Sequence, residues 1–175
     1  HTYSILYELM KFHKLFNQDF DDCWTIKDNW FGKEIAYQDP YRTKTYSNST
    51  EELFNSINKL NSTIFDSLKK CEVFIFTLGL TEVWKKKNNG LVACHFPGYV
   101  LGGGHDETYF YPSTYEDNLN NLRDIVKLSK KIHEHINIIF TVSPVPLTRT
   151  FRNIDVTIAN EESKSILRSA VSQII

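Results

Sequence analysis

Residues 73–84 read VFIFTLGLTEVW, and this stretch decides the fold that we expect for the chain. Its first half, Val73–Leu78, is a short apolar run rich in β-branched and aromatic residues, which is typical of a strand buried on both faces of a sheet. The run stops at Gly79, and polar groups follow at once. Ligands of open α/β sheets bind beyond the carboxyl ends of the strands, so this stretch predicts one side of a binding site.

A second stretch repeats this plan further along the chain. Residues 136–142 form another apolar run, and Ser143 and the turn Pro144–Pro146 follow it. Between the two runs, the pattern predicts a helix that is capped by Ser113 or Thr114. A strand, a helix and a strand form a βαβ unit with parallel strands, so we expect the two strand ends to lie side by side.

Apolar residues at helical spacing predict further helices elsewhere. These cover residues 3–16, 50–70 and 160–175. The second of them has Ser49 or Thr50 as its N-cap and acidic residues in its first turn, where the helix dipole favours negative charge. Strands that alternate with helices in this way indicate the α/β class.

The segments between these elements are predicted to be irregular or short. The lysines Lys85–Lys87 begin a polar turn that we expect to be a solvated tip, and residues 91–95 are predicted to return toward the site as a short strand. Residues 17–49 are irregular and aromatic, and include Trp24 and Trp30. A segment of this composition either covers a core or lines a cleft.

The composition is that of an ordinary globular domain. The chain has 175 residues, of which 41% are hydrophobic and 23% charged, enough for one domain with a proper core. A formal net charge of -1 argues against nucleic acid and anionic membranes as partners, because both usually require an excess of basic residues. No apolar run approaches the length needed to span a bilayer.

The cysteines predict a reducing compartment. Cys23, Cys71 and Cys94 are odd in number and widely spaced, so they form neither a disulfide framework nor a zinc motif. We therefore expect reduced thiols in a cytoplasmic protein, with no metal and no cofactor. A start at His1, with no secretory signal, is expected of a fragment of a longer chain.

Four candidate site residues lie just after the first apolar run. Gly79 would let a backbone or a substrate approach closely, and the Thr81 hydroxyl would donate to a developing oxyanion. Glu82 would orient a base or bind a substrate hydroxyl, and the flat face of Trp84 suits a sugar ring or an acyl chain. The structural alternative is a buried carboxylate tied to a turn and a tryptophan of the core.

Two further candidates are His95 and Ser143. His95 follows a short apolar run and precedes a loop bent by Pro97, which makes it the best-placed histidine, although a lone histidine is often structural. Ser143 is not expected to be a nucleophile, because the chain has no Gly-x-Ser-x-Gly elbow and Pro144 prevents a helix from following in the usual way. Its hydroxyl is predicted to form hydrogen bonds within the site.

Four blocks of the chain, taken in order, resemble the GSCFA family. They are Thr77–Trp84, Cys94–Pro97, Thr141–Val145 and Asn160–Lys164. The family takes its name from an N-terminal Gly-Ser-Cys-Phe-Ala motif and is placed with the SGNH-type hydrolases. The resemblance implies a three-layer α/β/α fold of the SGNH/flavodoxin-like type, built on a mainly parallel sheet. It also implies ester hydrolysis or acyl transfer through a serine.

The resemblance further implies that only part of the catalytic site lies in this chain. Gly79–Thr81 matches the block that helps to form the oxyanion hole, with Thr81 where many relatives have asparagine. The Gly-Ser-Cys-Phe-Ala motif and the Asp-x-x-His block that supplies the base are both missing from the sequence, and Pro146 replaces a usual basic residue. We therefore expect residues 1–175 to be a single domain, the middle part of a larger one, and inactive alone.

These observations lead to two main functional hypotheses. The first is a serine esterase or acyltransferase that acts on an O-acylated small molecule or glycan. The alternative is a non-catalytic carbohydrate-binding or scaffolding domain on a degenerate hydrolase fold, which the missing catalytic groups and the aromatic segment favour. A nucleotide-binding domain is disfavoured, because no glycine-rich turn links a strand to a helix.

Overall fold

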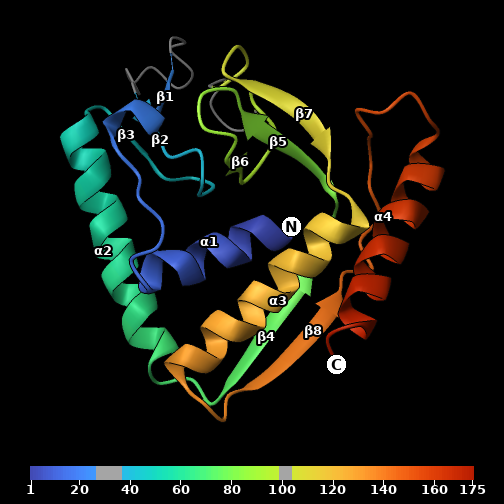
Figure 1. Cartoon of the computed structure of the whole chain (residues 1–175). Coiled ribbons are helices and arrows are strands. Elements are labelled where there is room, and N and C mark those ends of the chain that lie inside the picture. Colours follow the sequence, from blue (N-terminus) through green and yellow to red (C-terminus); the bar gives the residue numbers. More distant parts are fainter. Residues whose placement is uncertain (27–36, 99–103) are drawn as a thin grey trace.

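The computed structural model describes residues 1–26, 37–98 and 104–175 (Figure 1). Its helices are α1 (Thr2–Phe12), the 3-10 helix η1 (Phe20–Asp22), α2 (Thr50–Leu68), α3 (Tyr115–Ile132) and α4 (Val156–Ser172). Its strands are β1 (Trp24–Thr25), β2 (Tyr37–Gln38), β3 (Tyr46–Ser47), β4 (Val73–Leu78), β5 (Glu82–Lys86), β6 (Val92–Ala93), β7 (Thr108–Pro112) and β8 (Asn137–Val142). The predicted α/β class is confirmed.

Strands β4 and β8 pair in parallel over their whole length. The register runs from Val73 opposite Asn137 to Leu78 opposite Val142, and both arrows in Figure 1 point toward the same end of the molecule. Beyond the last pair, the Ser143 N–H donates to the Leu78 carbonyl oxygen at 2.8 Å. The prediction that both strands end at one edge of a sheet is confirmed.

The sheets are smaller and less parallel than predicted. Among the described residues, the parallel sheet contains only β4 and β8, and the other strands form two antiparallel sheets with the orders β1-β2-β3 and β6-β5-β7. The prediction of a mainly parallel sheet does not hold for this part of the chain. The reason is local, because β6 follows β5 after a short turn, and antiparallel strands need no crossover helix between them.

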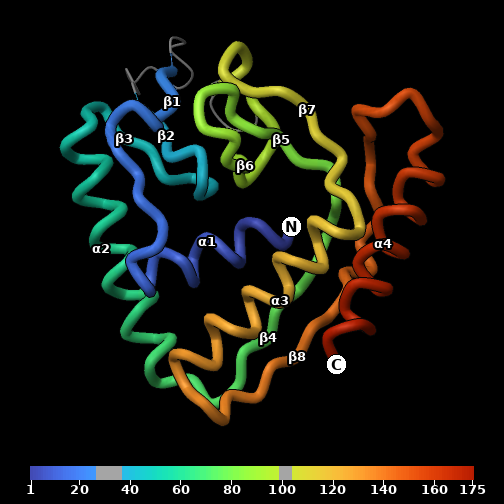
Figure 2. Tube along the Cα trace, in the orientation of Figure 1, coloured from blue at the N-terminus to red at the C-terminus, as the bar shows by residue number. Residues whose placement is uncertain are grey.

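Helices α1, α3 and α4 cover one face of the β4–β8 sheet (Figures 1 and 2). The apolar stripe of each helix faces this core, as the helical spacing predicts. The buried side chains at its centre come from all of these elements and include Leu9, Leu78, Leu122, Ile125 and Leu167. The packing holds the carboxyl ends of both strands in place.

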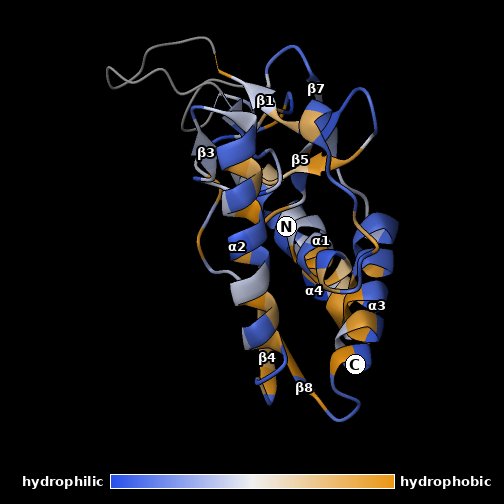
Figure 3. Ribbon diagram, turned by 90° about the vertical axis from the view of Figure 1, so that its left-hand side faces the viewer, coloured by the Kyte–Doolittle hydropathy of each residue, from blue (hydrophilic) through white to orange (hydrophobic). Residues whose placement is uncertain are grey.

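The opposite face of the β4–β8 sheet is open to solvent. Val73, Ile75 and Ile139 expose 43%, 64% and 47% of their surface, whereas Phe74, next in sequence, is buried. Figure 3 shows apolar colouring along both strands. The predicted burial of β4 on both faces is therefore wrong for the described structure. A continuous apolar run suits burial on both faces, but it cannot reveal whether a second layer is present.

Helix starts follow the capping signals of the sequence. Ser49 caps α2 by accepting a hydrogen bond from the Glu52 N–H at 3.2 Å, and Thr114 caps α3 in a capping box with Asp117. Both N-cap predictions are confirmed. Helix α4 begins about one turn before its predicted start, because Asp155 provides the cap by accepting from the Thr157 N–H.

The lysine run is not the solvated tip that its charge predicts. Lys86 lies on β5 with only 1% of its surface exposed. Its ammonium donates to the Asp22 carbonyl oxygen at 2.7 Å and to the Asp22 carboxylate at 3.0 Å. A buried lysine requires such partners, and here the partner lies far away in the sequence. The run of lysines therefore led to the prediction of a polar turn where the chain forms the end of strand β5.

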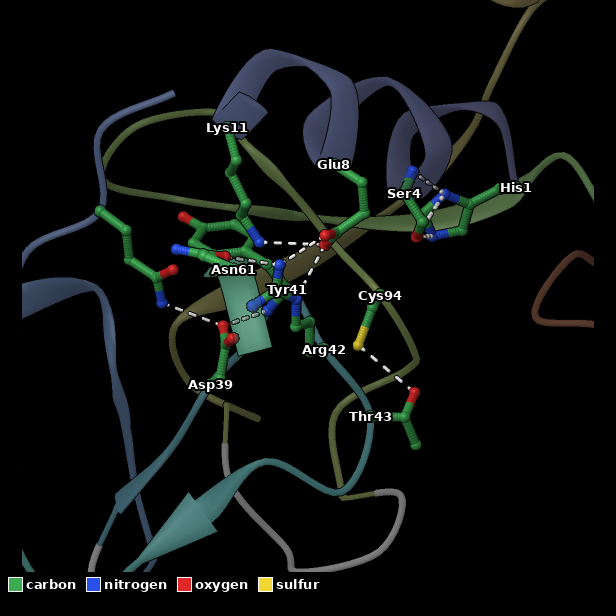
Figure 4. Close-up of polar contacts among 11 residues, drawn as sticks. His1, Ser4, Glu8, Lys11, Asp39, Tyr41, Arg42, Thr43, Asn61 and Cys94 are labelled. Atoms are coloured by element: carbon green, nitrogen blue, oxygen red, sulfur yellow. Dashed lines mark hydrogen bonds and ion pairs between the residues drawn. The ribbon is translucent and has the colours of Figure 1, made fainter. Parts of the chain in front are cut away.

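The described part of the aromatic segment covers the core, since Trp24 and Tyr41 are buried. Trp30 lies outside the described residues. Figure 4 shows how the segment is tied to α1: Glu8 accepts from Lys11 at 3.2 Å and from Arg42, whose Nε lies at 2.9 Å. The neighbouring Thr43 hydroxyl contacts the Cys94 sulfur at 3.6 Å. These contacts anchor the loop that carries Cys94 and His95.

Candidate functional site

The turn Gly79–Thr81, at the end of β4, is held by two adjacent residues of α4. The Lys164 ammonium donates to the Gly79 carbonyl oxygen at 2.6 Å. The Ser163 hydroxyl oxygen accepts from the Thr81 N–H at 2.9 Å and from the Thr81 hydroxyl at 3.2 Å. Burial, together with the nearby charge of Arg168, lowers the pKa of Lys164. Helix α4 therefore fixes the conformation of the turn.

Two predicted site residues belong to this turn. Gly79 has open space on its side-chain face, because an added Cβ atom would meet nothing within 4 Å. Thr81 is 4% exposed, and both of its donors point at Ser163. That Thr81 donates to an oxyanion stays a prediction. In this structure its hydroxyl serves the contact with α4.

A cavity of about 530 Å³ lies next to the turn. Its walls come from β5, the segment Ala93–Phe96 and the loop Pro146–Phe151, which follows β8. The predicted site residues Glu82, Trp84 and His95 all line it. Leu80 brings the turn to the cavity wall, whereas Gly79, Thr81 and Ser143 do not line it. The cavity therefore brings together three segments that lie far apart in the sequence.

Another cavity, of about 630 Å³, lies between η1 and the tip at Lys87, lined in part by Phe20, Asp21 and Glu107. None of its lining residues belongs to β4, to β8 or to the turns that follow them, where ligands of parallel sheets bind. The cavity beside Trp84 lies near those ends and has more apolar and aromatic walls, which are typical of small-molecule sites. We therefore take the latter as the candidate site.

Ser143 shapes the turn after β8. Its N–H donates to Leu78, and its hydroxyl oxygen accepts from the Val145 N–H at 3.2 Å. The side chain is therefore used locally, at the strand end, and Pro146 begins the wall of the cavity three residues later. The hydrogen bond that its hydroxyl forms lies in the turn after β8 and not in the cavity, so a role of Ser143 in the site stays a prediction.

Glu82 holds the loop that forms the far wall of the cavity. One carboxylate oxygen accepts a hydrogen bond from the Thr150 hydroxyl, and the other accepts from the Phe151 N–H at 3.1 Å. The Thr150 hydroxyl oxygen in turn accepts from the Arg152 N–H at 3.1 Å. Charge-assisted hydrogen bonds are among the stronger polar contacts in proteins, so Glu82 is well suited to position this loop.

Aromatic side chains form much of the cavity wall. The Phe151 ring meets Trp84 edge to face, with centroids 5.1 Å apart and planes at 87°, and lies 5.7 Å from the Phe96 ring. Sequence reasoning missed Phe151 and Arg149 as site residues. The available signal was weak: both follow a strand end by several residues, in a loop, where binding residues often occur.

His95 is bonded to protein through both ring nitrogens. Nδ1 lies 2.9 Å from the Phe96 carbonyl oxygen, to which it can only donate, and Nε2 then accepts from the Gln38 amide at 3.2 Å. Burial lowers the pKa of His95, against the opposing effects of Phe96 and Asp39. The ring is therefore neutral at pH 7, with its proton on Nδ1, and it packs edge to face on Trp24.

Cys94, the neighbour of His95, also lines the cavity. Burial raises the pKa of its thiol to about 12, so the sulfur is protonated at neutral pH and is a poor nucleophile. Within the described ranges, no three histidine, cysteine or acidic side chains gather closely enough to hold a metal ion. None of the described helices combines the length and the apolar composition needed to cross a bilayer.

Comparison with known proteins identifies a family and no individual relative. A family model described as the GSCFA family matches residues 1–175. No curated protein matches the chain, and no solved structure matches it either.

Proposed function

Because the chain belongs to the GSCFA family, we propose that it forms the substrate-binding part of a serine esterase or acyltransferase acting on an O-acylated small molecule or glycan. The observation that carries this proposal is the cavity of about 530 Å³ close to the paired ends of β4 and β8. Pockets of this size suit small-molecule ligands, and the wall of Trp84, Phe96 and Phe151 suits the flat face of a sugar ring.

Acyl transfer through a serine needs a nucleophile, a base and donors for the oxyanion. The serine oxygen attacks the ester carbonyl carbon, its proton passes through the base to the leaving alcohol, and water or an acceptor alcohol then releases the acyl group. In this proposal, the nucleophile and the base come from other parts of the protein, since the Cys94 thiol is protonated and both His95 nitrogens are already bonded.

The described residues would bind and orient the substrate. The open space beside Gly79 would admit the reacting ester group, and Thr81 would contribute a donor to the oxyanion if its hydroxyl turned away from Ser163. Trp84 would pack on the ring of the substrate. Glu82 would act indirectly, by holding Thr150 and Phe151 at the far wall.

We further propose that β4 and β8 are part of a larger parallel sheet in a three-layer fold of the SGNH type. The open face of the pair supports this proposal, because the large apolar side chains of Ile75 and Ile139 are exposed there and a second layer of helices would cover them. The free cysteines support a reducing compartment, and we propose the cytoplasm.

A non-catalytic carbohydrate-binding domain is the second candidate. The observation that favours it is that no serine lines this cavity among the residues that the structure describes. An aromatic-walled cavity without a nucleophile would still bind a glycan. Hydrolysis by the natural protein that contains residues 1–175 separates the two candidates.

The test measures esterase activity of that natural protein on p-nitrophenyl acetate. A Cβ atom added at Gly79 meets nothing within 4 Å, so we expect Gly79→Val to block the approach of the ester and leave the fold intact. Trp84→Ala removes an aromatic wall. Each variant should lower kcat/KM at least about tenfold, as expected when positioning of a substrate is lost. Tyr109→Ala, which truncates an exposed aromatic residue of β7, is the matched control and should keep full activity.

Two results would overturn the enzymatic proposal. One is a natural protein that hydrolyses no ester, which would leave the binding domain as the function. The other is full activity in both Gly79→Val and Trp84→Ala, which would move the chemistry to another part of the protein. Thermal unfolding of each variant, compared with that of the unmodified protein, separates loss of activity from loss of fold.

A further inference from the structure

We propose that Arg149 recognises a negatively charged group on the substrate, so that the cavity selects anionic esters over neutral ones. This inference rests on the proposed function, because it concerns the substrate class of the same cavity. It follows from the position of the Arg149 guanidinium, from the partners of the other charged groups in the cavity wall, and from the chemistry of the arginine side chain.

Arg149 is an exposed residue of the loop that Glu82 holds, and it lines the cavity. Its guanidinium carbon lies 5.7 Å from the centroid of the Phe96 ring, within the range of a cation–π contact. Arg149 makes no hydrogen bond and no ion pair with any described residue. Its N–H donors are therefore available to a ligand, while the ring limits where the guanidinium can go.

The other charged or ionisable side chains of the wall are already used or neutral. The two His1 ring nitrogens contact the Ala93 carbonyl oxygen at 3.0 Å and the Ser4 N–H at 3.2 Å, and the Cys94 thiol is protonated. Among the described lining residues, the one acidic side chain is Glu82. The Thr150 hydroxyl and the Phe151 N–H, both neutral donors, occupy its two carboxylate oxygens. His95 is neutral. Lys164 is not among the lining residues, and its ammonium donates to the Gly79 carbonyl oxygen. Arg149 is therefore the cationic side chain that the described wall presents to a ligand.

A guanidinium suits this role better than an ammonium would. Its planar fork matches the two oxygens of a carboxylate and can form two parallel hydrogen bonds, and its flat face packs on an aromatic ring. Phe96 provides such a ring. The two residues that follow Arg149 in the loop are held by the hydrogen bonds from Thr150 and Phe151 to Glu82. The cation is thus held before the ligand arrives, which reduces the entropy lost on binding.

The charge of the substrate could lie on either side of the ester bond. It could belong to the alcohol part, as in an acidic sugar, or to the acyl part, as in a dicarboxylic half-ester. Both provide a carboxylate to Arg149. Matched pairs that differ only in this charge distinguish the two sources: glucuronate with glucuronamide, and monomethyl succinate with methyl succinamate.

The experiment measures dissociation constants by calorimetry on the natural protein that contains residues 1–175. The acid of at least one pair should bind about tenfold more tightly than its amide, the size expected of one charge-assisted contact at an exposed site. Arg149→Gln should remove this preference, and Arg149→Lys should keep part of it, because the charge remains and the fork is lost. Arg123→Gln, which neutralises an exposed arginine of α3, should keep the full preference.

A preference for glucuronate assigns the charge to the alcohol part, and a preference for monomethyl succinate assigns it to the acyl part. Equal binding of acid and amide in both pairs would overturn the proposal, as would an unchanged preference in Arg149→Gln. The readout needs no turnover. A protein that shows the Arg149-dependent preference but hydrolyses no ester would therefore refute only the enzymatic function, and an esterase without the preference would refute only the role of Arg149.

Discussion

At the turn Gly79–Thr81, two side chains from another element decide the backbone conformation. Ser163 and Lys164 are adjacent on α4, yet they bind Thr81 and Gly79, which lie on the two sides of Leu80. Lys164 is 5% exposed, so its ammonium depends on the Gly79 carbonyl oxygen for a hydrogen bond within the protein. The side chains of α4 therefore hold the turn in place, and the space beside Gly79 stays open.

Replacement of Lys164 by methionine keeps most of the apolar stem but removes the donor to Gly79. We expect this change to lower the free energy of unfolding by about 1.5–3 kcal/mol, because a partly buried carbonyl oxygen loses a hydrogen bond to a charged group. Urea denaturation at pH 7 measures the loss. Lys127→Met, at an exposed position of α3, should change stability by less than about 0.5 kcal/mol. Equal effects of the two substitutions would show that the contact with Gly79 contributes nothing.

The element that leads from the antiparallel sheet back to β8 is α3, and its first turn is well capped. Asp117 accepts from the Thr114 N–H and hydroxyl, both at 2.8 Å, and from the Tyr111 hydroxyl at 2.7 Å. Partial burial raises the pKa of Asp117, but these hydrogen bonds outweigh burial and lower the pKa below its ordinary value. The carboxylate thus joins the end of β7 to the start of α3.

A depressed carboxyl pKa makes this contact sensitive to acid. Its contribution to stability is complete above the unfolded-state pKa of about 3.9 and is lost as the pH falls through the lower folded-state value. Asp117→Asn should therefore lower the free energy of unfolding by about 1 kcal/mol at pH 7, and the deficit should shrink as the pH falls below about 4. Denaturant unfolding across this pH range measures it. A constant deficit, or an equal one in Glu116→Gln, would exclude the charged cap as its source.

Elements set by local signals could be predicted, whereas those set by distant partners could not. Strand β4 was predicted with its observed bounds, and the caps of α2 and α3 follow directly from hydroxyl and acidic residues. Strands β5 and β7 were missed. Lys86 makes β5 look like a polar tip, and only its ion pair with Asp22 reveals why a lysine can be buried in a strand.

The candidate site divides in the same way. Glu82, Trp84 and His95 were predicted because they follow apolar runs in the sequence, and all line one cavity. Arg149 and Phe151 could not be predicted, because a loop without regular structure brings them there. That loop is held by a hydrogen bond between Thr150 and Glu82, 68 residues apart in the sequence. Contacts of such long range leave no periodic pattern.

At the scale of the whole molecule, the β4–β8 sheet has one packed face and one open apolar face. Phe74 is 4% exposed on the packed face, whereas Ile75 is 64% exposed on the other. Large apolar patches on a protein surface commonly mark a place where another layer or partner packs. The two faces therefore respond differently to the same kind of substitution, and this difference tests the proposal of a larger sheet.

Threonine keeps the β-branched shape of isoleucine but is polar, so it suits an uncovered strand position. In the chain of residues 1–175, the double substitution Ile75→Thr and Ile139→Thr should change the free energy of unfolding by less than about 1 kcal/mol, while Phe74→Thr should cost about 3 kcal/mol or more. In a longer protein in which the proposed layer covers the open face, the double substitution should cost at least about 2 kcal/mol, because buried hydroxyls replace buried ethyl groups. Urea denaturation of both proteins measures the difference. An equally small effect in the longer protein would mean that nothing packs on this face.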